Sequence, residues 1–278
     1  MATKKSASTA RKKPVAKKAT APVATTTKIT TVKATSTSQR SGLFTLGGSP
    51  ILAASIAEFV GTFLLTAVIL STQGQAVVVF FALIAIVLAV GAISGAYVNP
   101  LLTVGAWATR RISRLRAGGY LVAQVLGALM ALVVVNAFVA AAPQPAASQN
   151  PMMSQQGATL FKASQLVEGK EWFVLSAELL GAIIFAFAVA AATREKNRAA
   201  AALGIGGGLF VALVVSTYCV STVGMGGTIV NPAVAVALQA ISWKVWPIMI
   251  YVITPLIGGV VGFFLHDMIA DESGVKNA

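Results

Sequence analysis

Two short stretches of the chain, SGAYVNPLLTVG (residues 94–105) and GTIVNPAVAVAL (residues 227–238), each place an Asn-Pro pair among apolar residues. Asn is a favoured helix N-cap, and Pro at the first helical position loses no hydrogen bond because its N–H would have had no partner there. Each pair therefore predicts a helix start. The apolar segments that follow, 99–108 and 231–241, are too short to cross a membrane, so we expect two re-entrant half-helices.

The rest of the chain has the composition of a membrane protein. Of its 278 residues, 56% are hydrophobic and 10% are charged, and the mean hydropathy is +0.81, whereas an ordinary soluble domain has about 25% charged residues. Apolar stretches long enough to span a bilayer as helices occur six times. They cover residues 51–70, 76–95, 119–140, 172–192, 199–219 and 245–266.

Charge is distributed unevenly between the tail and the loops. About half of the 21 Lys and Arg residues lie between Lys4 and Arg40, in an N-terminal segment (1–48) without acidic residues, which predicts a disordered basic tail. The simplest interpretation of this tail is a solvated cytosolic extension; the functional interpretation is a polybasic arm that contacts anionic lipid headgroups in preference to nucleic acid, and an organelle transit peptide is a further alternative. Cations also follow the second and fourth spans, so the positive-inside rule predicts that both termini are cytoplasmic, in the plasma membrane. We expect a channel domain over 49–268 and a short tail over 269–278.

The two halves of the chain resemble each other. AEFVG (57–61) opens the first span and AELLG (177–181) opens the fourth, while AQVLGA (123–128) in the third span corresponds to TPLIGG (254–259) in the sixth. A unit of three spans begins its second copy on the opposite face, so the copies are related by inversion. The sequence thus predicts an all-α membrane protein with six transmembrane helices, two half-helices and an inverted 3+3 repeat. The positive ends of both half-helices and the two Asn amides then meet near the midplane, where non-helical backbone lines a water-filled cavity.

These paired motifs resemble the major intrinsic protein family, the aquaporins and aquaglyceroporins, over residues 50 to about 268. The resemblance implies one hourglass pore per protomer, a homotetramer, and passive flow of water or small uncharged solutes, with no cofactor and no enzymatic activity. It implies that Asn99 and Asn231 donate hydrogen bonds to the permeating molecule and that the half-helix dipoles repel cations. Pro100 and Pro232 would hold the helix starts, and Leu101 and Ala233 complete the two signatures, the first of which is NPL rather than NPA.

The same resemblance assigns further positions. Glu58 and Glu178 match buried acids that accept hydrogen bonds from loop backbone, the alternative being interfacial residues at helix ends. Counting without gaps from the asparagines, the four filter residues fall on Val79 (with Phe80 as the competing position), Cys219, Thr228 and Val234. Val234 stands where the family usually has Arg, and Tyr97 stands where it usually has a pore-lining His. A filter without the cation is wider and less polar, which favours glycerol, ammonia or other small neutral solutes.

A secondary transporter is the competing interpretation, because transporters also contain inverted repeats with broken helices. Ion-driven transport usually needs ionisable residues in the pathway, and the charged residues placed well within spans are Glu58 and Glu178, both at the family's structural positions. An enzyme is not supported. The single His, His266, lies at a span end, and the sequence has no Cys or His cluster with metal-ligand spacing.

Overall fold

The computed structural model describes residues 49–143 and 159–272, so the predicted tail at 1–48 and the last residues of the predicted C-terminal tail lie outside the described part. The described residues contain six stretches of helix that are long and apolar enough to cross a membrane. These are α1 (Pro50–Ser71), α2 (Ala76–Ser94), α4 (Arg114–Ala141), α5 (Glu171–Ala192), α6 (Arg198–Ser221) and the stretch Val245–Glu272. The last stretch consists of α8 (Val245–Ile248), a π-helical turn (Met249–Ile253) and α9 (Thr254–Glu272). The prediction of an all-α fold with six spans is confirmed.

Side chains outside the apolar stretches set where the long helices begin. Ser49 caps α1, followed by Pro50 at its first position, and Ser113 caps α4 by accepting a hydrogen bond from the Arg116 N–H at 3.3 Å. Asn197 caps α6 by accepting from two backbone N–H groups at 2.9 and 3.2 Å. Such caps satisfy donors that the helix itself leaves without partners. The third span therefore begins earlier than the hydrophobic stretch at 119–140 predicts.

The two Asn-Pro pairs begin short helices, as the sequence predicts. Pro100 opens α3 (Pro100–Ala108) and Pro232 opens α7 (Pro232–Ala237). The second half-helix is shorter than the predicted segment 231–241, because Gln239 adopts a left-handed backbone conformation with φ of 57°. A residue in this conformation cannot continue a right-handed helix, so the chain leaves α7 after Leu238.

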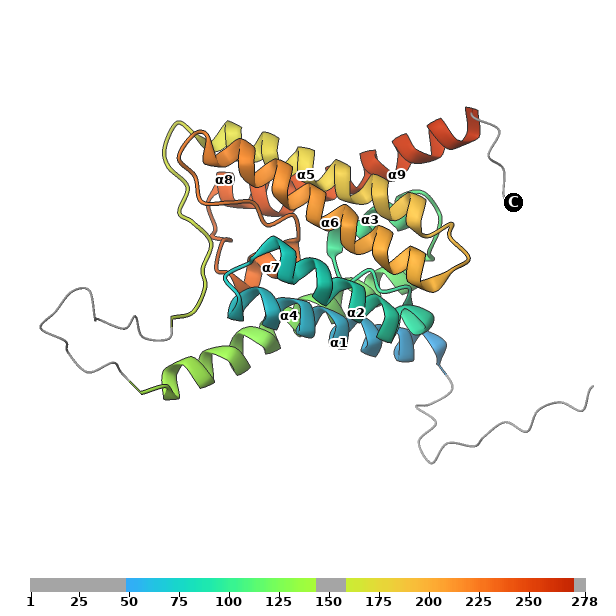
Figure 1. Cartoon of the computed structure of the whole chain (residues 1–278), viewed down its shortest axis with the longest axis horizontal. Helices are drawn as coiled ribbons and strands as arrows, with labels where there is room; N and C mark the ends of the chain where they lie inside the picture. The colour runs from blue at the N-terminus through green and yellow to red at the C-terminus, as the bar shows by residue number, and fades with distance from the viewer. Residues whose placement is uncertain (1–48, 144–158, 273–278) are drawn as a thin grey trace, which may run out of the picture. The chain divides into compact units, whose positions relative to one another are not determined.

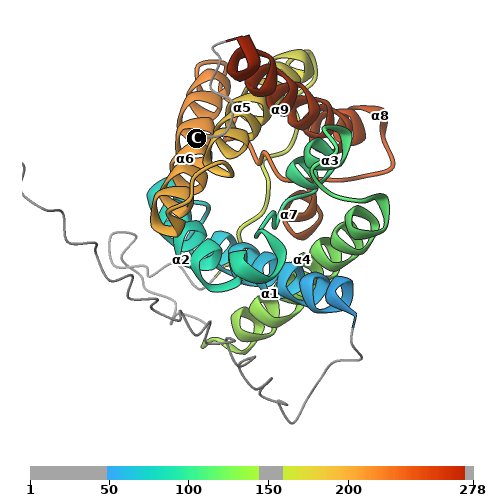
Figure 2. The same ribbon diagram turned by 90° about the vertical axis from the view of Figure 1, so that its right-hand side faces the viewer.

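The helix contacts repeat between the two halves of the chain (Figure 1). Within the first half α1 packs against α2 and α4, and within the second half α5 packs against α6 and α9. Helices α2 and α6 join the halves, α3 packs against α9 and α4, and α7 packs against α4. Each half-helix therefore contacts the third span of the opposite repeat, and Figure 2 shows α3 between α4 and α9 with α7 toward the centre. The two repeats therefore make the same contacts with each other, as expected for an inverted repeat.

Equivalent glycines permit close helix approaches in the two repeats. A Cβ at Gly127 of α4 would collide with the Phe59 carbonyl of α1, and a Cβ at Gly258 of α9 would lie 2.5 Å from the Ala182 Cβ of α5. Real Cβ atoms do not tolerate such distances, so only glycine allows these backbones to approach. Both close contacts fix the helices that support the half-helices.

Candidate functional site

Asn99 and Asn231 meet at the centre of the described helices. Each side-chain oxygen caps its own half-helix: Asn99 Oδ1 accepts from the Leu101 N–H at 3.0 Å, and Asn231 Oδ1 accepts from the Ala233 and Val234 N–H groups at 3.0 and 3.3 Å. Each side-chain nitrogen crosses to the other repeat. Asn99 Nδ2 donates to the Val230 carbonyl at 2.8 Å, and Asn231 Nδ2 donates to the Val98 carbonyl at 3.2 Å. An amide nitrogen carries two hydrogens, so each Asn keeps one for a further acceptor.

Two buried glutamates hold the backbone just before each Asn. Glu58 accepts hydrogen bonds from the Tyr97 and Val98 N–H groups at 2.9 and 2.6 Å, and Glu178 accepts from the Ile229 and Val230 N–H groups at 2.6 and 2.8 Å. Both carboxylates have a relative exposure of 0%, which does not fit the alternative of interfacial residues. The structure therefore brings each acid to the loop backbone at the position that the sequence assigns to it.

These carboxylates support strained backbone. Val98 and Val230 have φ values of 43° and 52°, in the left-handed region that β-branched residues rarely adopt. Such conformations cost about 1–3 kcal/mol each and persist only where the surroundings enforce them. The bonds from Glu58 and Glu178 supply that enforcement. The strain aims the two valine carbonyls at the asparagines of the opposite repeat.

The first glutamate has a side-chain partner that the sequence analysis missed. Gln124 of α4 donates through Nε2 to Glu58 at 2.8 Å and to the Thr103 hydroxyl of α3 at 2.8 Å. The equivalent positions in the second repeat are Pro255 and Ala235, and among the described residues Glu178 accepts from backbone N–H groups. A Gln inside an apolar span, three residues before one copy of the repeated glycine, was the available signal.

A cavity of about 240 Å³ lies beside the two asparagines. Val79 and Val234, both 1% exposed, line it together with Thr228, so three of the four predicted filter positions surround one space. Phe80, the competing position for Val79, does not line the cavity and instead stacks near Phe210 of α6, with ring centroids 5.8 Å apart.

The structure does not place Cys219 at this cavity. Cys219 is exposed on α6, and Thr217 lines the cavity in its place, on the same helix face as Leu213 and Leu209. Residues four apart share a helix face, whereas two positions are separated by about 200° around the axis. Counting without gaps from Asn231 therefore leads to a face of α6 other than the one that lines the cavity.

One wall of the cavity carries hydroxyl groups. The Thr228 hydroxyl lies 2.6 Å from the Ser216 hydroxyl and 3.2 Å from the Thr217 hydroxyl, and the Thr228 N–H donates to Thr217 Oγ1 at 3.3 Å. Val79, Val234 and Ile69 form apolar parts of the lining. The filter region thus pairs a hydroxyl wall with an apolar wall.

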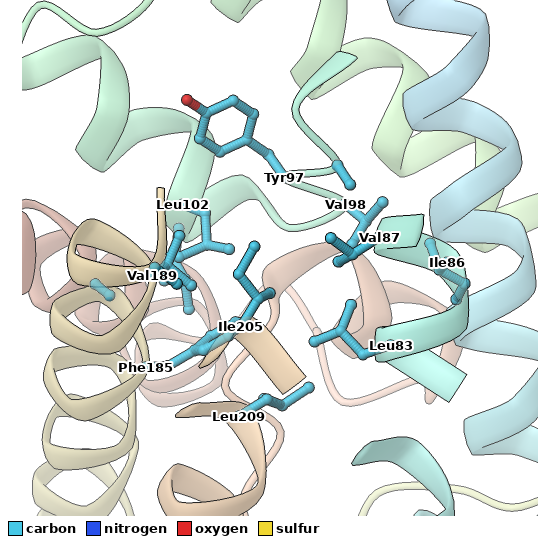
Figure 3. Close-up of a cluster of buried hydrophobic side chains, with 14 of the residues drawn as sticks. Leu83, Ile86, Val87, Tyr97, Val98, Leu102, Phe185, Val189, Ile205 and Leu209 are labelled. Carbon is cyan, nitrogen blue, oxygen red and sulfur yellow. The ribbon is translucent and has the colours of Figure 1, made fainter. Parts of the chain in front are cut away.

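A cluster of buried apolar side chains adjoins the cavity, and Figure 3 shows part of this cluster. Leu83, Phe185 and Leu209 line the cavity and also belong to this buried cluster. One helical turn further on, the same three helices contribute the buried residues Val87, Val189 and Ile205. Tyr97 is 9% exposed at this end, with its ring 6.0 Å from that of Tyr120. The position that the family resemblance assigns to a pore-lining His therefore belongs to this buried apolar cluster.

Comparisons with known proteins agree with this geometry. The family model described as major intrinsic protein matches residues 46–266. A probable aquaporin PIP2-4 of Arabidopsis thaliana is 29% identical over 195 residues, covering 66% of this chain and 60% of the relative. Aquaporin-1 of Canis lupus familiaris is 28% identical over 180 residues, covering 65% and 60%. The chain thus spans about 60% of the length of these curated relatives.

The fold also matches a solved structure. The aquaglyceroporin from Plasmodium falciparum superposes with a TM-score of 0.54 at 17% sequence identity, covering 81% of this chain and 96% of that chain. At this level of identity the likeness concerns the fold alone. It agrees with the arrangement of spans and half-helices described above.

Proposed function

The chain belongs to the major intrinsic protein family, and on that premise we propose that this multi-pass membrane protein is a passive channel for water or small uncharged solutes such as glycerol and ammonia. The observation that carries the proposal is the crossed pair of asparagines at the two half-helix starts. Each amide has one hydrogen bonded to the opposite repeat and a second hydrogen without an assigned acceptor.

The asparagines account for selection of neutral molecules. A solute oxygen at the centre of the pore accepts hydrogen bonds from Asn99 and Asn231, which replaces part of its hydration. The positive ends of α3 and α7 meet at the same place, so a cation there experiences repulsion from both helix dipoles. The pore centre therefore favours uncharged solutes with an accepting oxygen or nitrogen atom.

The filter region favours solutes larger and less polar than water alone. Val234 contributes no charge and no hydrogen-bond donor from its side chain, while Thr217 and Thr228 supply hydroxyl groups on the facing wall. Desolvating water against an apolar wall costs more than desolvating a molecule with an apolar face, because fewer groups replace the lost hydrogen bonds. This arrangement supports flow of glycerol-like solutes.

The proposal extends to the setting of the channel. By the family resemblance the protein is a homotetramer with one pore per protomer. The positively charged loops favour a plasma-membrane protein with both termini in the cytoplasm, where the basic tail contacts anionic lipid headgroups. The cations that support this orientation follow α3 and α5, and they are Arg110, Arg111, Arg114, Arg116, Arg194, Lys196 and Arg198.

Stopped-flow light scattering on proteoliposomes tests the function. Purified protein should accelerate both shrinkage in an impermeant osmolyte and reswelling in glycerol relative to empty vesicles, without an imposed ion gradient. Fast water flow without glycerol entry would contradict the permissive filter. Solute entry that requires an ion gradient would replace the channel with the transporter alternative, and no acceleration of either flux would contradict the proposal as a whole.

A further inference from the structure

A segment outside the spans and half-helices reaches the cavity. Residues 160–164 precede α5 in the connection between the two repeats, and three of them, Phe161, Ala163 and Ser164, line the same cavity as Asn99 and Asn231. The sequence analysis gave this connection no role. The cavity lining therefore includes residues of this connection in addition to the predicted filter positions.

The segment is fixed against the second half-helix. The Ala163 N–H donates to the Leu238 carbonyl at the end of α7 at 3.0 Å. The Phe161 ring lies against Gly74, where a Cβ would be 3.2 Å from the ring atom Cε1, and Gly74 itself has φ of 68°. A side chain at position 74 would thus be strained and would press on the ring. The backbone bond and the glycine contact both hold Phe161 at the cavity.

The segment packs against Val234, the position at which the family usually has Arg. Val234 belongs to a buried apolar cluster with Leu70 and Leu238, against which Leu160 and Phe161 pack. A guanidinium at position 234 would lose its hydration among these apolar side chains, which carries a high energetic cost unless it is paired. Val234 and the segment that covers it are therefore both apolar where they meet. The Phe161 ring lines the cavity near Val234, where the family usually has Arg.

The same segment separates two spaces. A second groove of about 520 Å³ is lined by polar residues of the connection and of the loop after α7, including Glu168, Gln239 and Lys244. Ala163 and Ser164 line both this groove and the cavity. A solute that moves between the groove and the asparagines consequently passes the wall to which Phe161 belongs.

We propose that Phe161 is a specificity-determining residue of this pore, whose ring limits the size of the neutral solutes that reach Asn99 and Asn231 beside the apolar Val234. This inference rests on the proposed channel function. Because the ring is rigid and apolar, it narrows the passage without offering a hydrogen bond, and it selects by cross-section rather than by polarity.

A permeability series on proteoliposomes tests the role of the ring. Phe161→Ala should raise the ratio of erythritol to glycerol permeability by about tenfold, since pore diameter sets the cut-off for neutral solutes. Phe161→Leu, which keeps an apolar contact with Gly74, should give a smaller rise. The matched control is Lys162→Ala, because Lys162 is exposed and lies outside the cavity lining. An unchanged ratio in both Phe161 variants that still conduct glycerol would overturn the inference.

Cysteine labelling provides a second measurement, which reports whether a group attached at position 161 obstructs the path of the solute. Cys219 is the single cysteine of the chain, so Cys219→Ser gives a background in which Phe161→Cys or Lys162→Cys can be labelled in detergent with a bulky thiol reagent and then reconstituted. Labelling at 161 should reduce glycerol flux at least about fivefold by obstructing the pore, whereas labelling at 162 should leave it unchanged. A labelled position 161 that conducts normally would overturn the inference.

The two proposals fail in different ways. Unmodified protein that conducts neither water nor glycerol would contradict the channel and, with it, the role of Phe161. Unmodified protein that conducts, combined with a size ratio insensitive to position 161, would contradict the role of Phe161 alone.

Discussion

The two repeats hold the residue before each Asn in the same way, yet they surround that contact differently. In both, a buried Glu accepts two backbone N–H groups and holds a valine at positive φ. Around Glu58 the helices add Gln124 and Thr103, whereas the equivalent positions around Glu178 are Pro255 and Ala235. The part common to both is a pair of backbone bonds to the Glu and an Asn cap. The remaining polar contacts belong to one repeat.

The third residue of each Asn-Pro signature also differs between the two repeats in its surroundings. Leu101 is 0% exposed and joins the large apolar cluster of the fold, while Ala233, also 0% exposed, packs with Ala128 and Ala237. A Cβ at Gly259 of α9 would collide with the Leu101 carbonyl, and its counterpart in α4 is Ala128. The contact at Gly259 is with the Leu101 backbone, so the glycine lets α9 approach α3 closely, while the Leu101 side chain packs in the large apolar cluster.

Replacing Glu58 or Glu178 should have the largest effect on stability and flux, and it tests the backbone bonds that both repeats share. Glu58→Ala leaves three donors without an acceptor and Glu178→Ala leaves two, at about 1–3 kcal/mol for each buried orphan donor. Both variants should lose glycerol flux, and the melting temperature of the purified protein in detergent should fall further for Glu58→Ala. Ser176→Ala, at an exposed position of α5, is the control. A larger loss for Glu178→Ala would mean that the bond from Gln124 adds no stability.

Exchanging the third signature residue should have the next largest effect. Leu101→Ala removes a fully buried side chain and should lower the free energy of unfolding by about 2–5 kcal/mol through the cavity it leaves. Leu101→Met keeps the volume and should cost less than about 1.5 kcal/mol. Thermal or denaturant unfolding in detergent measures both. Equal stability of Leu101→Ala and the unmodified protein would show that an alanine fits both repeats equally well.

Simplifying the first repeat toward the second should have the smallest effect. Gln124→Leu removes one hydrogen bond to Glu58 and one to Thr103. It also removes the buried Gln124 Oε1, which has no partner among the described groups, so we expect the free energy of unfolding to fall by only about 1–2 kcal/mol. Glycerol flux should persist, since the second repeat holds its loop without such a side chain. In a double-mutant cycle with Glu58→Ala the coupling energy should be about 0.5–3 kcal/mol. A coupling near zero would separate Gln124 from the glutamate energetically.

The sequence predicted the features that depend on repeated local patterns. Hydropathy located the six spans, and the Asn-Pro caps located both half-helices, because these signals lie within single segments. The end of α7 at Ala237, with Leu238 as its C-cap, could not be predicted, because it follows from the positive φ of Gln239 within an apolar run. Thr217 was missed in favour of Cys219 because the length of a turn decides which helix face meets the cavity. Phe161 was missed because its place depends on contacts with Gly74 and α7, far away in the sequence.

The crossed asparagine bonds also constrain how the protein is made. Asn99 and its acceptor, the Val230 carbonyl, are 131 positions apart, and Asn231 and the Val98 carbonyl are 133 positions apart. During synthesis the first half-helix therefore emerges long before its acceptor exists, and its amide cannot be satisfied until the second repeat has been inserted and docked. Contacts between such distant residues form late because ordering the intervening chain precedes them. The two crossed bonds thus form only after both repeats have been made and have come together.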